Sequence, residues 1–187
     1  MFQLKNIVKS LDDWYAQHSA SLGYQESNRG GNSYLWFPDI TAANCMTHFW
    51  AFKILCITEM AELRRQNSEM PADDNSLPEV IRLSNCIMRS TGYLTREEMK
   101  LFGIFSTYFP VHTVFQALQG QERIREDCSL LHAFAEQHRP AIEKLIELDC
   151  VSPSISRLLE YQDARVPPAL VAAHANYLVQ ATGRWAS

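Results

Sequence analysis

Hydrophobic residues recur every three or four positions along most of the chain, which is the spacing that gathers them on one face of an α-helix. Residues 4–22 follow this spacing and predict an amphipathic first helix. The segment 39–66 begins at Asp39, whose carboxylate suits the N-cap of a helix, and its middle is apolar on nearly every side. We therefore expect a central helix surrounded by others, separated from the first helix by a loop over 23–38.

Capping signals and prolines divide the second half of the chain. Ser76 with Glu79, and Thr95 with Glu98, have the spacing of capping boxes and predict helices over about 76–90 and 95–120. Pro110 should kink the second of these helices, and Gly120 should end it. Further helical patterns cover residues 124–146 with a bend or break at Pro140, residues 152–161 and residues 169–182.

No segment shows a convincing alternation of period two, and no repeat of fixed length is found. The expected fold is therefore all-α: one irregular helical bundle of about seven to nine helices, with residues 1–187 forming a single domain. A chain of 187 residues with 47% hydrophobic residues can bury a sizeable core in one domain.

Composition and charge narrow the class of protein. The formal net charge of −4 argues against a chain that binds nucleic acid directly, since such proteins carry a basic surplus. The N-terminal residues contain no secretory signal pattern, and the apolar stretch 49–60 is interrupted by Lys53 and Glu59, so no membrane span is expected. The five cysteines are odd in number and scattered, which favours free thiols. We expect an intracellular protein, cytoplasmic or nuclear.

Two of the six histidines are candidates for acid–base chemistry. His48 lies within the central apolar helix, and His112 follows Pro110, where a kink frees a backbone carbonyl. The simpler interpretation of each, which the sequence favours, is a buried polar group that only satisfies its hydrogen bonds. His132, His138 and His174 lie on patterns rich in surface residues, and we assign them no role.

No metal site and no cofactor site is predicted. The pairs Cys45 with His48 and Cys128 with His132 have usable ligand spacing, but two ligands do not make a metal centre. The sequence contains no CxxC, HxxxH or HExxH motif, and it lacks the glycine-rich phosphate loops and the GxSxG motif.

Aromatic residues gather in two segments that should pack together, and they are most simply interpreted as core. A sharper hypothesis is that they line an apolar small-molecule pocket, in which the two histidines are among the few polar groups. The residues nominated as ligand-binding are Trp36, Trp50, Phe105 and Tyr108.

The two segments, WFPDITAANCMTHFWAFKILCITEM (36–60) and EMKLFGIFSTYFPVHTVFQAL (98–118), resemble the C-terminal helical region of fungal transcription factors of the binuclear zinc cluster class. In that family this region follows a six-cysteine DNA-binding cluster and regulates it through effectors or intramolecular contacts. This chain lacks such a cluster, so DNA binding is not implied.

Two hypotheses follow. In the first, the chain is a transcription-factor-like helical module without a DNA-binding domain, which binds a small hydrophobic molecule or a protein partner and could form a homo-oligomer. An exposed apolar patch of partner size would favour it. In the alternative, the chain is an enzyme of fungal secondary metabolism, a cyclase or isomerase, with His48 or His112 as the acid or base in an aromatic pocket.

Overall fold

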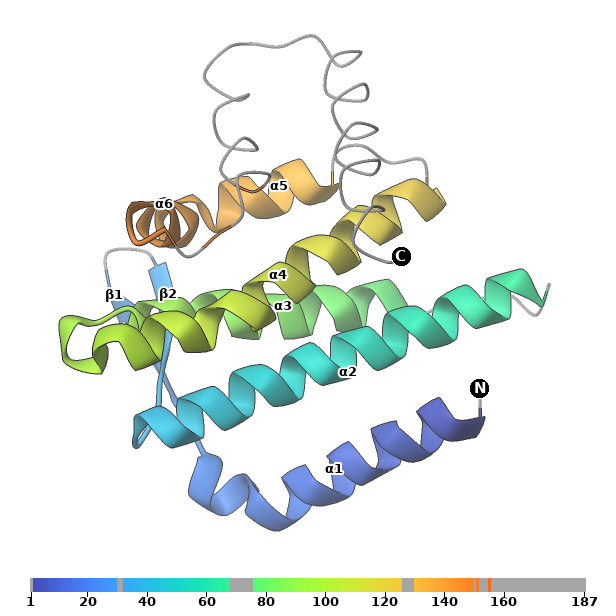
Figure 1. The fold of residues 1–187 in the computed structure, drawn as a ribbon, viewed down its shortest axis with the longest axis horizontal. Coiled ribbons are helices and arrows are strands. Elements are labelled where there is room, and N and C mark those ends of the chain that lie inside the picture. Colours follow the sequence, from blue (N-terminus) through green and yellow to red (C-terminus); the bar gives the residue numbers. More distant parts are fainter. Residues whose placement is uncertain are drawn as a thin grey trace, which may run out of the picture.

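The structure is a computed structural model that describes residues 2–29, 32–67, 76–125, 130–149, 151 and 155. The described chain is predominantly helical, as predicted, with one small sheet (Figure 1). Its elements are, in order, α1 (Phe2–Leu22), β1 (Gln25–Arg29), β2 (Asn32–Trp36), α2 (Ile40–Gln66), α3 (Ser76–Leu94), the 3₁₀ turn η1 (Glu97–Met99), α4 (Lys100–Arg125), α5 (Leu130–Gln137) and α6 (Arg139–Glu147).

The helix α2 is the centre of the bundle, and α1, α3 and α4 all pack against it (Figure 1). It begins where the sequence predicts, because the Asp39 carboxylate accepts a hydrogen bond of 2.8 Å from the Ala42 amide. Its last residue, Gln66, also agrees with the prediction. The segments around Trp50 and Pro110 are therefore neighbouring helices of one bundle, α2 and α4, as the sequence indicates.

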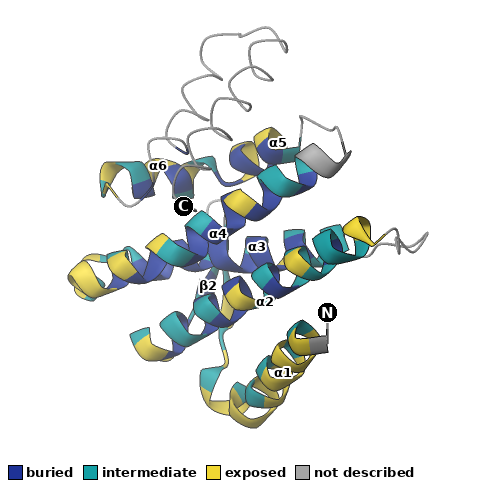
Figure 2. Cartoon of the chain, turned by 45° about the vertical axis from the view of Figure 1, so that its right-hand side comes forward, coloured by how far each residue is buried: buried dark blue, intermediate teal, exposed yellow. Residues whose placement is uncertain are grey.

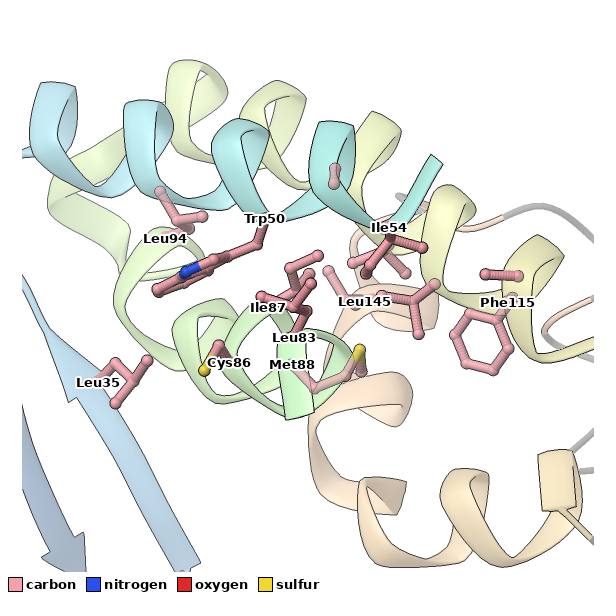
Figure 3. Packing of buried hydrophobic residues seen from close by; sticks show 14 of the residues in the cluster. Leu35, Trp50, Ile54, Leu83, Cys86, Ile87, Met88, Leu94, Phe115 and Leu145 are labelled. Carbon is pink, nitrogen blue, oxygen red and sulfur yellow. The ribbon is translucent and has the colours of Figure 1, made fainter. Parts of the chain in front are cut away.

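The core lies between α2, α3 and the later helices (Figure 3). Trp50 and Ile54 of α2 meet Leu83 and Ile87 of α3, and Leu145 of α6 belongs to the same cluster. All five side chains are at most 3% exposed. Burial of this kind contributes about 1.5–3 kcal/mol for each large apolar side chain, so this cluster is the main source of stability.

The expectation of a loop over 23–38 is wrong, because β1 and β2 form an antiparallel hairpin with Gln25 opposite Trp36. The hairpin lies against α3. Leu35 of β2 is fully buried, and Arg89 of α3 donates a hydrogen bond of 2.5 Å to the Ser33 hydroxyl. Contacts between β2 and α3 thus hold the hairpin in place. The polar sequence of β1 gives no sign of these contacts.

The start of the fourth long helix also differs from the prediction. The Thr95 hydroxyl does not cap a helix; it donates to the Thr91 carbonyl oxygen at 2.8 Å, and η1 intervenes before α4 begins at Lys100. The first turn of α4 then passes very close to the end of α3. A Cβ atom at Gly103 would lie 2.0 Å from the Leu94 carbonyl oxygen, so this approach requires glycine.

The helix α4 passes through Pro110, as predicted, but also through Gly120, where the sequence predicts its end. The predicted helix over 124–146 is interrupted. Its first residues belong to α4, and α5 and α6 meet at His138, beside Pro140 in the first turn of α6.

The described residues contain six α-helices, against the seven to nine expected for the whole chain. The predicted helices over 152–161 and 169–182 lie outside the described residues.

The described part of the chain also contains one helix, α2, that is long and apolar enough to cross a bilayer by length and composition alone. Half of its most apolar window is buried inside the fold, which is equally typical of the core helix of a bundle.

Candidate protein-docking site

The helix α4 carries no charged residue between Lys100 and Glu122. A helix that packs one face against a core normally presents charged residues on its opposite face. The inner side of α4 is buried through Val111, Val114 and Leu118. Its outer side must therefore present uncharged residues to solvent.

In the first half of α4 these outer residues are large and apolar. The exposed fractions are 67% for Leu101, 58% for Phe102, 73% for Phe105 and 53% for Tyr108. Exposed and buried positions alternate along this helix in Figure 2. Phe52 of the neighbouring α2 adds a fourth exposed ring, at 46%, and is the fifth exposed apolar side chain. We call these five residues the aromatic face.

Partly buried rings connect the two helices beneath the aromatic face. The Phe109 ring lies 5.4 Å from the Phe52 ring and 5.5 Å from the His48 imidazole, centroid to centroid. These distances are those of favourable aromatic pairs. Phe109 therefore anchors Phe52 against α4, so that the exposed rings of α2 and α4 belong to one surface.

His48 is half-buried at the edge of this surface. Its Nδ1 atom lies 2.9 Å from the Asn44 carbonyl oxygen on the preceding turn. A carbonyl oxygen only accepts, so Nδ1 carries the hydrogen and donates it. The structure thus gives His48 the structural interaction considered above, a bond to the backbone of its own helix.

His112 lies one turn beyond Tyr108, and the two rings stack at 6.2 Å with an interplanar angle of 15°. Burial lowers the pKa of His112 below its usual value, so the imidazole is neutral at pH 7. Among the described residues, neither His112 nor His48 is hydrogen-bonded to a carboxylate that would orient it as an acid or base.

The four aromatic residues nominated as ligand-binding do not share one pocket. Trp50 is 3% exposed within the core, and Trp36 lies on the hairpin with its ring 5.7 Å from Tyr93. Phe105 and Tyr108 lie on the solvent side of α4. A chain of ring contacts, from Tyr93 to Phe37, connects Trp36 with Trp50. The other two nominated residues belong to the aromatic face instead.

On the hairpin side, Trp36 contacts a positively charged side chain. The Arg96 guanidinium lies 4.6 Å from the Trp36 ring and 4.4 Å from the Tyr93 ring, within the range of cation–π attraction. Its Nε also donates to the Tyr93 carbonyl oxygen. The Trp36 ring therefore packs against side chains of the protein itself, Tyr93 and Arg96.

Within the described residues, no group of three or more His, Cys, Asp and Glu side chains is arranged to hold a metal ion. Cys45 and His48 belong to α2, whereas Cys128 lies outside the described residues. Cys45, Cys56 and Cys86 are free thiols, and burial raises the pKa of Cys56 and Cys86.

Sequence reasoning assigned Phe52, Phe102 and their neighbours to the core and did not single out Leu101. The available signal was the charge-free run over 101–121. A helix of that length whose sides are all uncharged is either surrounded by other elements or presents an apolar surface. The periodicity alone does not distinguish these two cases, because both give the same pattern.

Comparison of this chain with family models, with curated proteins and with solved structures found no match.

Proposed function

We propose that this protein is a transcription-factor-like helical interaction module without a DNA-binding domain, and that it binds a protein partner through the aromatic face. The observation that carries the proposal is the exposure of Leu101, Phe102, Phe105 and Tyr108 on one uncharged side of α4. Soluble domains seldom leave contiguous large apolar side chains in water unless they bind something there.

The composition of the aromatic face suits a protein partner. Aromatic residues are enriched in the centres of protein interfaces, and charged residues are depleted there. Phe105 is the most exposed of the five, at 73%, and it lies between Leu101 and Tyr108 along the helix. It therefore has the position of a central anchor, with the other side chains around it.

The same face is unsuited to nucleic acid. Binding to phosphates depends on lysine or arginine side chains. Residues 101–121 of α4 contain neither, and Lys100 precedes them at the start of the helix. The net charge of −4 points in the same direction. The module would act in the cytoplasm or nucleus by binding protein through this face.

The alternative, a cyclase or isomerase of secondary metabolism, requires an enclosed pocket with a placed acid or base. Its nominated residues are divided between the core and the solvent, with Trp50 at 3% and Phe105 at 73% exposure. His48 donates to its own helix, and His112 stacks on an exposed tyrosine. This geometry favours the interaction module over the enzyme.

The test is site-specific photocrosslinking in cells. Phe105 is replaced by p-benzoylphenylalanine, a residue of similar shape, and the control places the same group at Ala133, an exposed position of α5. Irradiation is expected to attach a protein to position 105 and none to position 133. The adduct should disappear when the patch is altered by Leu101→Ser, which changes a side chain that is 67% exposed.

Mass spectrometry of the adduct then identifies the attached protein as a second copy or a different chain. Equal labelling at positions 105 and 133, or no adduct at position 105, would contradict the proposed function.

A further inference from the structure

We infer that the partner on the aromatic face is a second copy of this chain, which packs α4 against α4 about a two-fold axis. The inference rests on the proposed function and names its partner. A two-fold interface uses the same patch on both copies, so it requires a patch that can face itself without conflict.

The first reason is the spacing of the outer residues of α4. Leu101, Phe105, Tyr108 and His112 follow one another at intervals of four, three and four residues. This is the spacing of the seam of paired helices, in which side chains of one helix fit between those of the other. The seam spans about 16 Å along the helix axis.

The second reason is charge. A two-fold axis brings each group close to its own copy or to its neighbours, so a charged group near the axis meets a like charge. The outer side of α4 has no charged residue from Leu101 to Gln121. His112, at one end of the seam, is kept neutral at pH 7 by burial that lowers its pKa. Self-association therefore carries no electrostatic penalty along the seam.

The third reason is area. If a large side chain presents about 200 Å², the exposed fractions of the aromatic face correspond to about 600 Å² of apolar surface per copy. A stable interface of standard size buries about 800 Å² per partner, core and rim together. The aromatic face is thus large enough for the core of such an interface, and exposed Gln116 supplies part of a polar rim.

The geometry follows from the seam. If the axis passes between Phe105 and Tyr108, the two helices run antiparallel, and Phe105 of one copy lies over Tyr108 of the other. Leu101 then lies over His112 of the other copy, and Phe52 of α2 flanks the helix pair on the side where it contacts Phe109. Because the arrangement is symmetric, the same pair of side chains meets at both ends of the seam.

The experiment is light scattering coupled to size exclusion on the full chain, over about 1 to 100 µM. The wild-type chain is expected at twice its mass of 21.4 kDa. Phe105→Glu should raise the dissociation constant of the dimer at least about 30-fold, because it places two carboxylates near the axis. Ala133→Glu, which adds the same charge at an exposed position of α5, should leave the mass unchanged.

A second measurement tests the two-fold arrangement itself. Phe105→Glu and Phe105→Lys should each be monomeric alone and should form a mixed dimer when combined, since opposite charges then meet near the axis. Phe105 is 73% exposed, so both variants should keep the helical circular dichroism spectrum and melting temperature of the wild type.

A wild-type chain that has the mass of one copy throughout the range overturns the inference. A Phe105→Glu variant that remains a dimer also overturns it, because the interface then lies elsewhere. In either case, a photocrosslink from position 105 to a different protein would leave the proposed function standing, and its absence would remove both.

Discussion

His138 is a buried side chain whose environment controls its protonation. It is 8% exposed, and its Nε2 atom lies 2.7 Å from Asn85 Oδ1, to which it donates because that oxygen only accepts. The Phe134 ring lies 4.6 Å away. Burial, and in second place the charge of Arg89, lower the pKa of His138 from 6.5 to about 4.

This shift predicts how stability depends on pH. Between pH 6.5 and 4 the unfolded chain protonates this histidine and the folded chain does not, so acid favours unfolding. We expect His138 to contribute a loss of about 3 kcal/mol in the free energy of unfolding as the pH falls through this window. Denaturant unfolding at several pH values measures the loss.

The matched control is His138→Gln, which keeps a side-chain amide able to donate to Asn85 but does not titrate. Its stability should fall less steeply between pH 6.5 and 4 than that of the wild type. If stability fell equally steeply with pH in both proteins, His138 would be taking up its proton in the folded chain within this pH range, which contradicts the prediction.

Some roles of individual side chains can be predicted from the sequence, and others cannot. The N-cap role of Asp39 was predictable, because the cap depends on neighbours within three residues. The expectation that His138 lies among surface residues is wrong, because its burial depends on Asn85 of α3, which is 53 positions away in the chain. Thr95 was misassigned because its hydroxyl had a competing acceptor, the Thr91 carbonyl, one turn earlier.

At the scale of elements, the start of α2 depends on one side chain. Replacing Asp39 with alanine removes the acceptor of the Ala42 amide and should lower the free energy of unfolding by about 1 kcal/mol. Asp39→Asn, which retains a capping oxygen, should cost only a few tenths of that. Urea unfolding of the three proteins checks the prediction, and equal losses for both variants would assign the effect to charge rather than to capping.

The helices could be predicted from the sequence better than the hairpin. The long helices follow from periodicity, but the hairpin was missed because β1, with the sequence QESNR, is polar on both faces. Gly30-Gly31 between the two strands is a sequence signal for a two-residue hairpin turn that could have found it. The strands owe their place to Leu35 and to the Arg89 contact with Ser33, which only the folded chain brings together.

At the largest scale, the sequence predicts a predominantly helical fold with the 39–66 helix at its centre, and the described residues agree. What the sequence could not predict is which side of α4 the bundle covers. Phe102, Phe105 and Phe115 are chemically alike, yet the first two are 58% and 73% exposed and the third is 2% exposed. The side is chosen by α2, α3 and α5, which occupy the inner face.

The central claim is that this chain by itself leaves the aromatic face of α4 open to a partner. Hydroxyl-radical footprinting of the full chain, diluted until light scattering gives the mass of one copy, tests it by comparing phenylalanines with one another. We expect Phe102 and Phe105 to be oxidised several times faster than Phe115 and Phe134, which are 2% and 4% exposed. Protection of Phe105 to the level of Phe115 in the single copy would contradict the account, because the face would already be covered by the chain's own residues.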